Sequence, residues 1–222
     1  MKNYYKKVTG KKKGFTLIEL LIVIAILVIL AVVVILTLNP AQLLAQARDS
    51  QRMSDLATLK SAISLYLADV STTSLNCGLG TTTTAVPAGW VYSSVSGVST
   101  TTLTVYNPLS PGSGPFPSAS STITTSTIGT SSTPGNINGT GWIPISFSAI
   151  SSGAPLGMEP IDPSNSLANN LFYAYGSGSS CTFKLTAHME STRYEAGGPN
   201  NVESTDGGDS STTYETGTNL NL

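Results

Sequence analysis

The sequence has no charged residue between Asp69 and Glu159, and the charges that it does have are unevenly placed. Six of its eleven basic residues are lysines at positions 2, 6, 7, 11, 12 and 13. Eight of its twelve acidic residues lie from Glu159 onward, beside only Lys184 and Arg193. Beyond residue 14 the chain is therefore acidic, and it lacks the clustered Lys and Arg that counterion release from nucleic acid requires. We expect no nucleic-acid partner.

The sequence also lacks the patterns of common catalytic and metal sites. It has no Gly-rich phosphate loop and no G-x-S-x-G nucleophile elbow. Its single histidine, His188, has no Cys or His nearby in sequence, so we expect it to face solvent or to be hydrogen-bonded. Glu203, Asp206 and Asp209 could offer oxygen ligands to Ca²⁺, but their spacing is not that of an EF-hand, and a solvated acidic loop is the alternative. The sequence predicts no enzyme, no cofactor and no metal.

Residues 15–38 form an apolar run that only Thr16, Glu19 and Thr37 interrupt. As a helix it would be about 36 Å long at roughly 1.5 Å per residue, longer than a bilayer core of ~30 Å. It is too long for the apolar region of an ordinary signal peptide, and no A-x-A cleavage site follows it. The preceding lysines favour a cytoplasmic N-terminus. We therefore predict one membrane span, with the rest of the chain outside.

Glu19 is unusual because it lies inside this run. An ionised carboxylate within a span costs about 2.5–3.5 kcal/mol at the helix centre, and less near its end. Such a residue is a functional candidate by default, unless it lies close enough to the helix end to reach the headgroups. Together, the basic stretch, the Gly-Phe junction, this acid and the apolar run resemble the class III leader of type IV prepilins and type II secretion pseudopilins. The resemblance covers every position of Lys13-Gly14-Phe15-Thr16-Leu17-Ile18-Glu19.

The resemblance implies a route of processing and assembly. In that family a membrane prepilin peptidase cuts after Gly14 and methylates the new N-terminal residue, Phe15. Glycine suits the cut because its backbone can extend into a catalytic groove. The new α-amino group, largely protonated at neutral pH, can pair in a filament with Glu19 of a neighbouring copy and set the register between helices. The implied partners are further copies of the chain, the peptidase, the membrane, and an assembly platform with its ATPase.

A second helical segment is expected at residues 39–70. Asn39 and Pro40 could start a new helix, but we favour one continuous helix with a kink at Pro40. The face that packs on the domain is predicted from helical spacing to carry Leu56, Leu59, Ile63, Tyr66 and Leu67. The opposite face should turn its charges toward neighbours, with i,i+3 pairs between Asp49, Arg52 and Asp55.

Residues 71–222 are expected to form a β-rich domain. Enrichment in β-branched and aromatic residues predicts strands at 90–95, 101–106, 142–147, 171–175 and 182–187, the last two as a hairpin. A Ser/Thr-rich loop at 107–141 is either O-glycosylated or unmodified, and Asn138-Gly139-Thr140 fits an N-glycosylation sequon. The predicted fold class is α+β, in which a long N-terminal helix, transmembrane in its first half and amphipathic in its second, packs on a C-terminal antiparallel sheet.

The only cysteines are Cys77 and Cys181. In an exported domain they are expected to form a disulfide, although two separate thiols remain the alternative.

Three functions are compatible with these features. The first is the structural subunit of a type IV pilus on the cell surface, which the neutral Ser/Thr-rich region favours. The second is a type II secretion pseudopilin, which the Asp162-Pro163 turn and the acidic tail favour. The third is a membrane anchor that displays a binding domain without polymerising. The leader argues against the third, because a plain anchor needs neither the Gly14-Phe15 junction nor Glu19.

Overall fold

The computed structural model describes residues 14–70, 91–95, 134–177 and 181–221. The chain divides into two compact units, Met1–Ala41 and Gln42–Leu222. The leader before Gly14, the strand expected at 101–106 and residues 107–133 of the expected loop lie outside the described residues.

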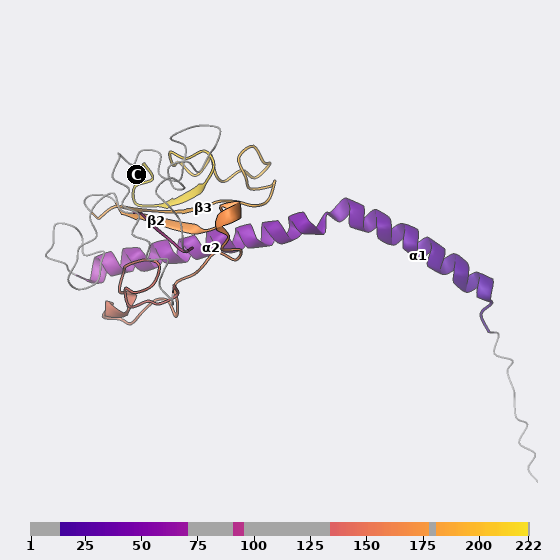
Figure 1. The fold of residues 1–222 in the computed structure, drawn as a ribbon, viewed down its shortest axis with the longest axis horizontal. Coiled ribbons are helices and arrows are strands. Elements are labelled where there is room, and N and C mark those ends of the chain that lie inside the picture. Colours follow the sequence, from indigo (N-terminus) through magenta and orange to yellow (C-terminus); the bar gives the residue numbers. More distant parts are fainter. Residues whose placement is uncertain (1–13, 71–90, 96–133, 178–180, 222) are drawn as a thin grey trace, which may run out of the picture. The chain divides into compact units, whose positions relative to one another are not determined.

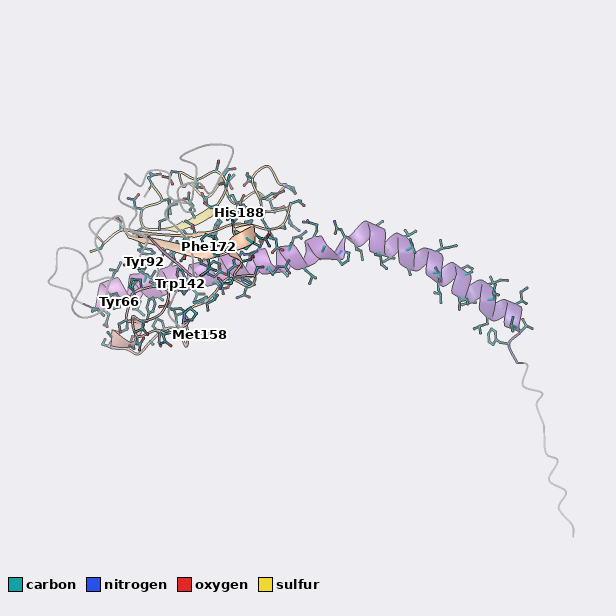
Figure 2. All side chains as sticks on the ribbon, viewed as in Figure 1. Tyr66, Tyr92, Trp142, Met158, Phe172 and His188 are labelled. Atoms are coloured by element: carbon teal, nitrogen blue, oxygen red, sulfur yellow. The ribbon has the colours of Figure 1, made fainter. Side chains whose placement is uncertain are left out.

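Helix α1 (Leu17–Leu38) makes up most of the described part of the first unit. Its apolar side chains project on all sides of the helix (Figure 2). Thr37 is a polar residue near its end, and its hydroxyl donates to the carbonyls of Val33 and Val34 at 3.0 and 3.1 Å. This back-bonding satisfies the hydroxyl within the helix, as an apolar environment requires.

The helix does not continue through Asn39. This residue ends α1 with φ 40° and ψ 72°, a left-handed conformation that Asn tolerates better than most residues. Pro40 is then the first residue of helix α2 (Pro40–Asp69), where its missing N–H is tolerated. The expectation of one continuous helix kinked at Pro40 is therefore wrong. Inside a helix, a proline loses the hydrogen bond to the carbonyl four residues earlier and its ring clashes with that carbonyl.

In the second unit, α2 lies along a four-stranded antiparallel sheet (Figure 1). The strands follow the order β1 (Val91–Ser93), β2 (Tyr173–Ser177), β3 (Phe183–Ala187) and β4 (Tyr214–Gly217). The hairpin of β2 and β3 pairs Tyr173 with Ala187 and Ser177 with Phe183, which confirms the predicted pairing with small shifts of its ends. Strand β4 was not predicted, because four residues with a glutamate and a glycine carry little strand signal. The α+β fold class is confirmed.

The core of this unit is formed by α2, the sheet and the segment 142–156. Leu56, Leu59, Ile63 and Tyr66 are buried on α2 as predicted, and Leu67 is partly buried. The rings of Tyr66 on α2 and Phe147 meet edge-on, with their centroids 6.5 Å apart. Elsewhere in the core, the ring centroids of Trp142 and Tyr173 are 6.3 Å apart. Tyr66, Tyr92 and Trp142 are labelled in Figure 2.

The segment 142–147 is buried but is not a strand, so that prediction is wrong. It has one isolated bridge, Asn138 with Ser146, and it ends in a 3₁₀ turn, η2 (Phe147–Ala149). Pro144 has no N–H to give to a ladder. The amide of Ile143 donates instead to the side chain of Glu159 at 2.9 Å. A carboxylate therefore replaces a neighbouring strand as the hydrogen-bond partner.

The charges of α2 are also placed differently from the expectation. Asp49 and Arg52 are completely buried. The predicted i,i+3 pair of Asp49 and Arg52 is confirmed, since the Asp49 carboxylate accepts from Arg52 at 2.7 Å. The carboxylate also accepts from the backbone amides of Glu190 and Ser191 at 2.9 and 2.8 Å. Arg52 also donates to Asp162 and, at 3.4 Å, to Glu190. The prediction that these charges point to neighbours is wrong, because they join α2 to two distant loops of the same unit.

Candidate functional site: the N-terminal junction and the apolar helix

The Gly14-Phe15 junction is accessible in the structure. Phe15 is 86% exposed, and a Cβ added at Gly14 would have no atom within 4 Å. Both residues precede α1 and belong to no helix or strand. The bond therefore lies before the helix, so cleavage there would not require the helix to unfold.

Thr16 and Glu19 form a reciprocal cap at the start of α1. Thr16 is the N-cap, and its hydroxyl accepts from the amide of Glu19 at 3.3 Å. The Glu19 carboxylate accepts in return from the amide and the hydroxyl of Thr16, each at 2.8 Å. These bonds satisfy donors that a helix start leaves open, and the acid lies at the positive end of the helix dipole. The Thr-x-x-Glu pattern before an apolar run was a readable signal for this cap that our sequence reasoning missed.

Among the described residues, one helix is long and apolar enough to cross a membrane. Its span is Leu17–Ile35, with a mean hydropathy of 3.5 and no residue buried within the chain. A single soluble subunit rarely leaves so large an apolar surface uncovered. Such a surface is normally covered, by lipid or by protein.

The remaining predicted site residues are scattered. Pro40 begins α2. Cys181 is disulfide-bonded, and Cys77 lies outside the described residues. Asn138 of the sequon is exposed, and its side-chain oxygen accepts from the amide and the hydroxyl of Thr140 at 3.2 and 2.7 Å.

The three carboxylates considered for Ca²⁺ do not come together. Glu203 accepts from the amides of Met189 and Ala196 at 2.8 and 2.9 Å, whereas Asp209 pairs with Lys184. Asp206 accepts from the backbone of the turn and of strand β4. Over the described ranges, no group of three or more His, Cys, Asp and Glu is arranged to hold a metal ion.

His188 is hydrogen-bonded, as one of the two expectations had it. Its Nδ1 lies 2.8 Å from the carbonyl of Thr212 and 3.1 Å from the Glu203 carboxylate. Burial lowers the pKa of His188, but the interactions with Glu203 and Thr212 outweigh it and raise the pKa overall.

Glu159 is a buried acid that the sequence did not single out. One carboxylate oxygen accepts from Ile143, and the other, Oε1, has no hydrogen-bond partner among the residues that the structure describes. A Cβ at Gly141 would collide with this carboxylate, so the glycine makes room for it. Burial raises the pKa of Glu159 to about 8. Nothing in its neighbourhood in the sequence indicates that an acid is needed there.

The N-terminal segment matches a known protein family. The family described as the prokaryotic N-terminal methylation motif matches residues 9–35, which include the junction, the cap and most of the apolar helix. No curated protein and no solved structure shows significant similarity to the chain. At its N-terminus, the chain therefore carries the prokaryotic N-terminal methylation motif, the class III leader of type IV pilins and pseudopilins.

Proposed function

We propose that this chain is the structural subunit of a type IV pilus-like filament on the cell surface. Prepilin peptidase cleaves the precursor after Gly14 and methylates Phe15, and the mature subunits then assemble through helix α1. The observation that carries this proposal is the uncovered apolar surface of α1 directly behind a class III leader. A bilayer covers that surface before assembly, and the same helix of neighbouring copies covers it in the filament.

Glu19 supports the same assignment. In the isolated chain its carboxylate caps its own helix through Thr16. A carboxylate has several acceptor positions, so it can keep this cap and also accept from the methylated amine of an adjacent copy. In an apolar filament core, each of the two charges is costly alone and is stabilised by the other. The pair would therefore select one axial offset between neighbouring helices.

A pseudopilin of a type II secretion system is the second candidate. The observation that favours it is the Asp162-Pro163 turn before the sheet, which resembles a turn of major pseudopilins. In this chain Asp162 is buried and accepts from the amides of Ser164 and Asn165 at 2.8 and 3.1 Å. The two candidates share processing and helix packing, and they differ in the length and location of the filament.

The test is to shear cells that express the chain and to examine the released material by electron microscopy and mass spectrometry. We expect long filaments that contain the chain and a tryptic peptide of residues 15–48 that begins with N-methylated Phe15. Processed chain that is confined to the cell envelope, without surface filaments, would contradict the pilus assignment and favour the pseudopilin. Chain that keeps residues 1–14 and stays in the membrane would contradict both.

A further inference from the structure

A completely buried lysine lies between two carboxylates on the sheet. The Nζ atom of Lys184, on strand β3, is 2.6 Å from Oδ1 of Asp209 and 2.6 Å from Oε1 of Glu215. It also donates to the carbonyl of Leu220 at 3.1 Å. The side chains of Lys184 and Glu215 have no exposed surface, and that of Asp209 is 16% exposed.

Strand pairing and a tight loop hold these three groups in place. Thr186 is opposite Glu215 in the register of β3 with β4, so Lys184 is the diagonal neighbour of Glu215 on the same face of the sheet. The other oxygen of Glu215 accepts from the amide of Ser210 at 3.0 Å, which fixes the carboxyl against the loop that carries Asp209. A side chain at Gly208 would collide with Glu215, so this loop can approach only because residue 208 is a glycine.

The charges in this cluster are costly where they lie. An ion that loses its water is destabilised, and its partners offset this only in part. Burial raises the pKa of Glu215 to about 7, so that a large share of this carboxyl is protonated at neutral pH. The Lys184 ammonium, the Asp209 carboxylate and the Glu215 carboxyl lie within hydrogen-bond reach, and acids and bases positioned in this way can move the protons that amide formation requires.

We infer that Lys184 and Asp209 condense after folding into a side-chain amide bond, with Glu215 as the acid–base residue. The N···O distance of 2.6 Å brings Nζ to about 3–3.5 Å from Cγ of Asp209, which is the range of near-attack geometry. The ammonium of Lys184 first passes a proton to Asp209, and both groups become neutral. The Nζ lone pair then forms a bond to Cγ. Glu215 takes a proton from Nζ and gives one to the departing hydroxyl as the C–O bond breaks.

The step converts one ammonium and one carboxylate into one amide and one water, with no change of oxidation state. Asp209 is the acceptor because its partial exposure gives the water a way out, whereas Glu215 is fully buried and held by Ser210. The product removes the buried charge of Lys184 and the partly buried charge of Asp209. It also joins β3 covalently to the loop before β4, and so fastens the C-terminal strand to the sheet.

The direct test is the mass of the full chain, purified from membranes in detergent and reduced. After allowance for cleavage and methylation, we expect it to be lower than the sequence mass by one water. Trypsin locates the bond, because an acylated Lys184 is not cleaved. The linked chain gives residues 61–193 joined to residues 194–222, whereas the unlinked chain gives 61–184, 185–193 and 194–222 separately. The full sequence mass together with the three separate peptides would overturn the inference.

Two variants test whether Glu215 takes part in forming the amide bond or only in the ion pair with Lys184. Glu215→Gln keeps the size of the side chain but cannot relay a proton, and we expect most of this variant to remain unlinked. Glu203→Gln changes a buried carboxylate outside the cluster and is the matched control, which should be linked as fully as the wild type. Equal linkage in both variants would overturn the role of Glu215. The mass of the wild-type chain shows whether the amide bond forms, even if a variant fails to fold.

Discussion

Arg52 and Asp162 form a two-bond ion pair in which neither side chain is exposed. The Arg52 Nε donates to Oδ2 at 2.7 Å and Nη2 donates to Oδ1 at 3.0 Å, although the residues are 110 positions apart. Since Asp162 also accepts from the amides of Ser164 and Asn165, this pair fixes the turn before β2 to helix α2. The same arginine holds Asp49, so removal of its charge leaves two buried carboxylates without their cation.

We therefore expect Arg52→Met to destabilise the domain by about 3–5 kcal/mol, the usual cost of breaking a buried ion pair from one side. Arg48→Met is the control. Arg48 pairs with Glu190 where both side chains are partly exposed, and such a pair contributes about 0–1 kcal/mol. Urea unfolding of the full chain in detergent, followed by tryptophan fluorescence, measures the free energy of unfolding of both variants. Equal losses in the two variants would show that the charge of Arg52 has no special role.

The charge of Glu19 can be separated from its role as a cap. Glu19→Gln keeps the reciprocal cap, because Gln is accepted at this position, but it removes the negative charge. We expect this variant to insert into membranes normally and to form no filaments. Thr16→Ala keeps the charge and loses the hydroxyl's part of the cap, which costs about 0.5–2 kcal/mol of helix stability, and it should still assemble. Electron microscopy of material sheared from cells compares the filaments that the two variants form. Normal filaments from Glu19→Gln would refute the pairing of Glu19 with the amine.

Cleavage should depend on the small size of residue 14. Gly14→Val has room in the structure, so we expect the chain to fold and insert but to accumulate as uncleaved precursor. Gly157→Val is a matched control, because a Cβ there also meets no atom within 4 Å. An immunoblot that resolves precursor from mature chain checks the result. Processing of Gly14→Val at the wild-type rate would contradict the assigned junction.

Glu159 should make the stability of the domain depend on pH. Burial raises its pKa from 4.5 to about 8, so between these values the folded chain holds a proton that the unfolded chain releases. The contribution of Glu159 is therefore fully present below about pH 4.5 and is lost as the pH rises toward 8. Glu159→Gln is always neutral and should lack this loss.

The measurement is the free energy of unfolding of both chains from pH 5 to pH 9, taken as a difference at each pH. Glu215 and His188 have raised pKa values too and give a slope of the same sign, but they are present in both chains and cancel in the difference. We expect the variant to gain stability relative to the wild type as the pH rises. Parallel curves would mean that Glu159 is ionised in the folded domain.

Features that depend on neighbouring residues could be predicted from the sequence. The leader and the apolar run are linear patterns; the comparison confirmed the leader motif at residues 9–35, and the structure has the apolar run as a helix. The junction at Gly14 stays a prediction. The buried face of α2 follows from helical spacing, and the hairpin of β2 and β3 follows from two apolar segments close in the chain. The Thr16–Glu19 cap is equally local and was missed only because its pattern was not applied.

The sequence by itself determined that the chain carries an N-terminal methylation motif and that an apolar helix follows, because such a motif and a hydrophobic run depend on residues adjacent in the chain. Only the tertiary structure decided which charges are buried. A buried Arg, Glu or Lys has the same side chain as one on the surface, so the residue type does not reveal its burial. The groups that surround Arg52, Glu159 and Lys184 come from segments that are distant in sequence. Burial changes the free energy of a charge by several kcal/mol, and the contacts that offset this cost exist only after folding.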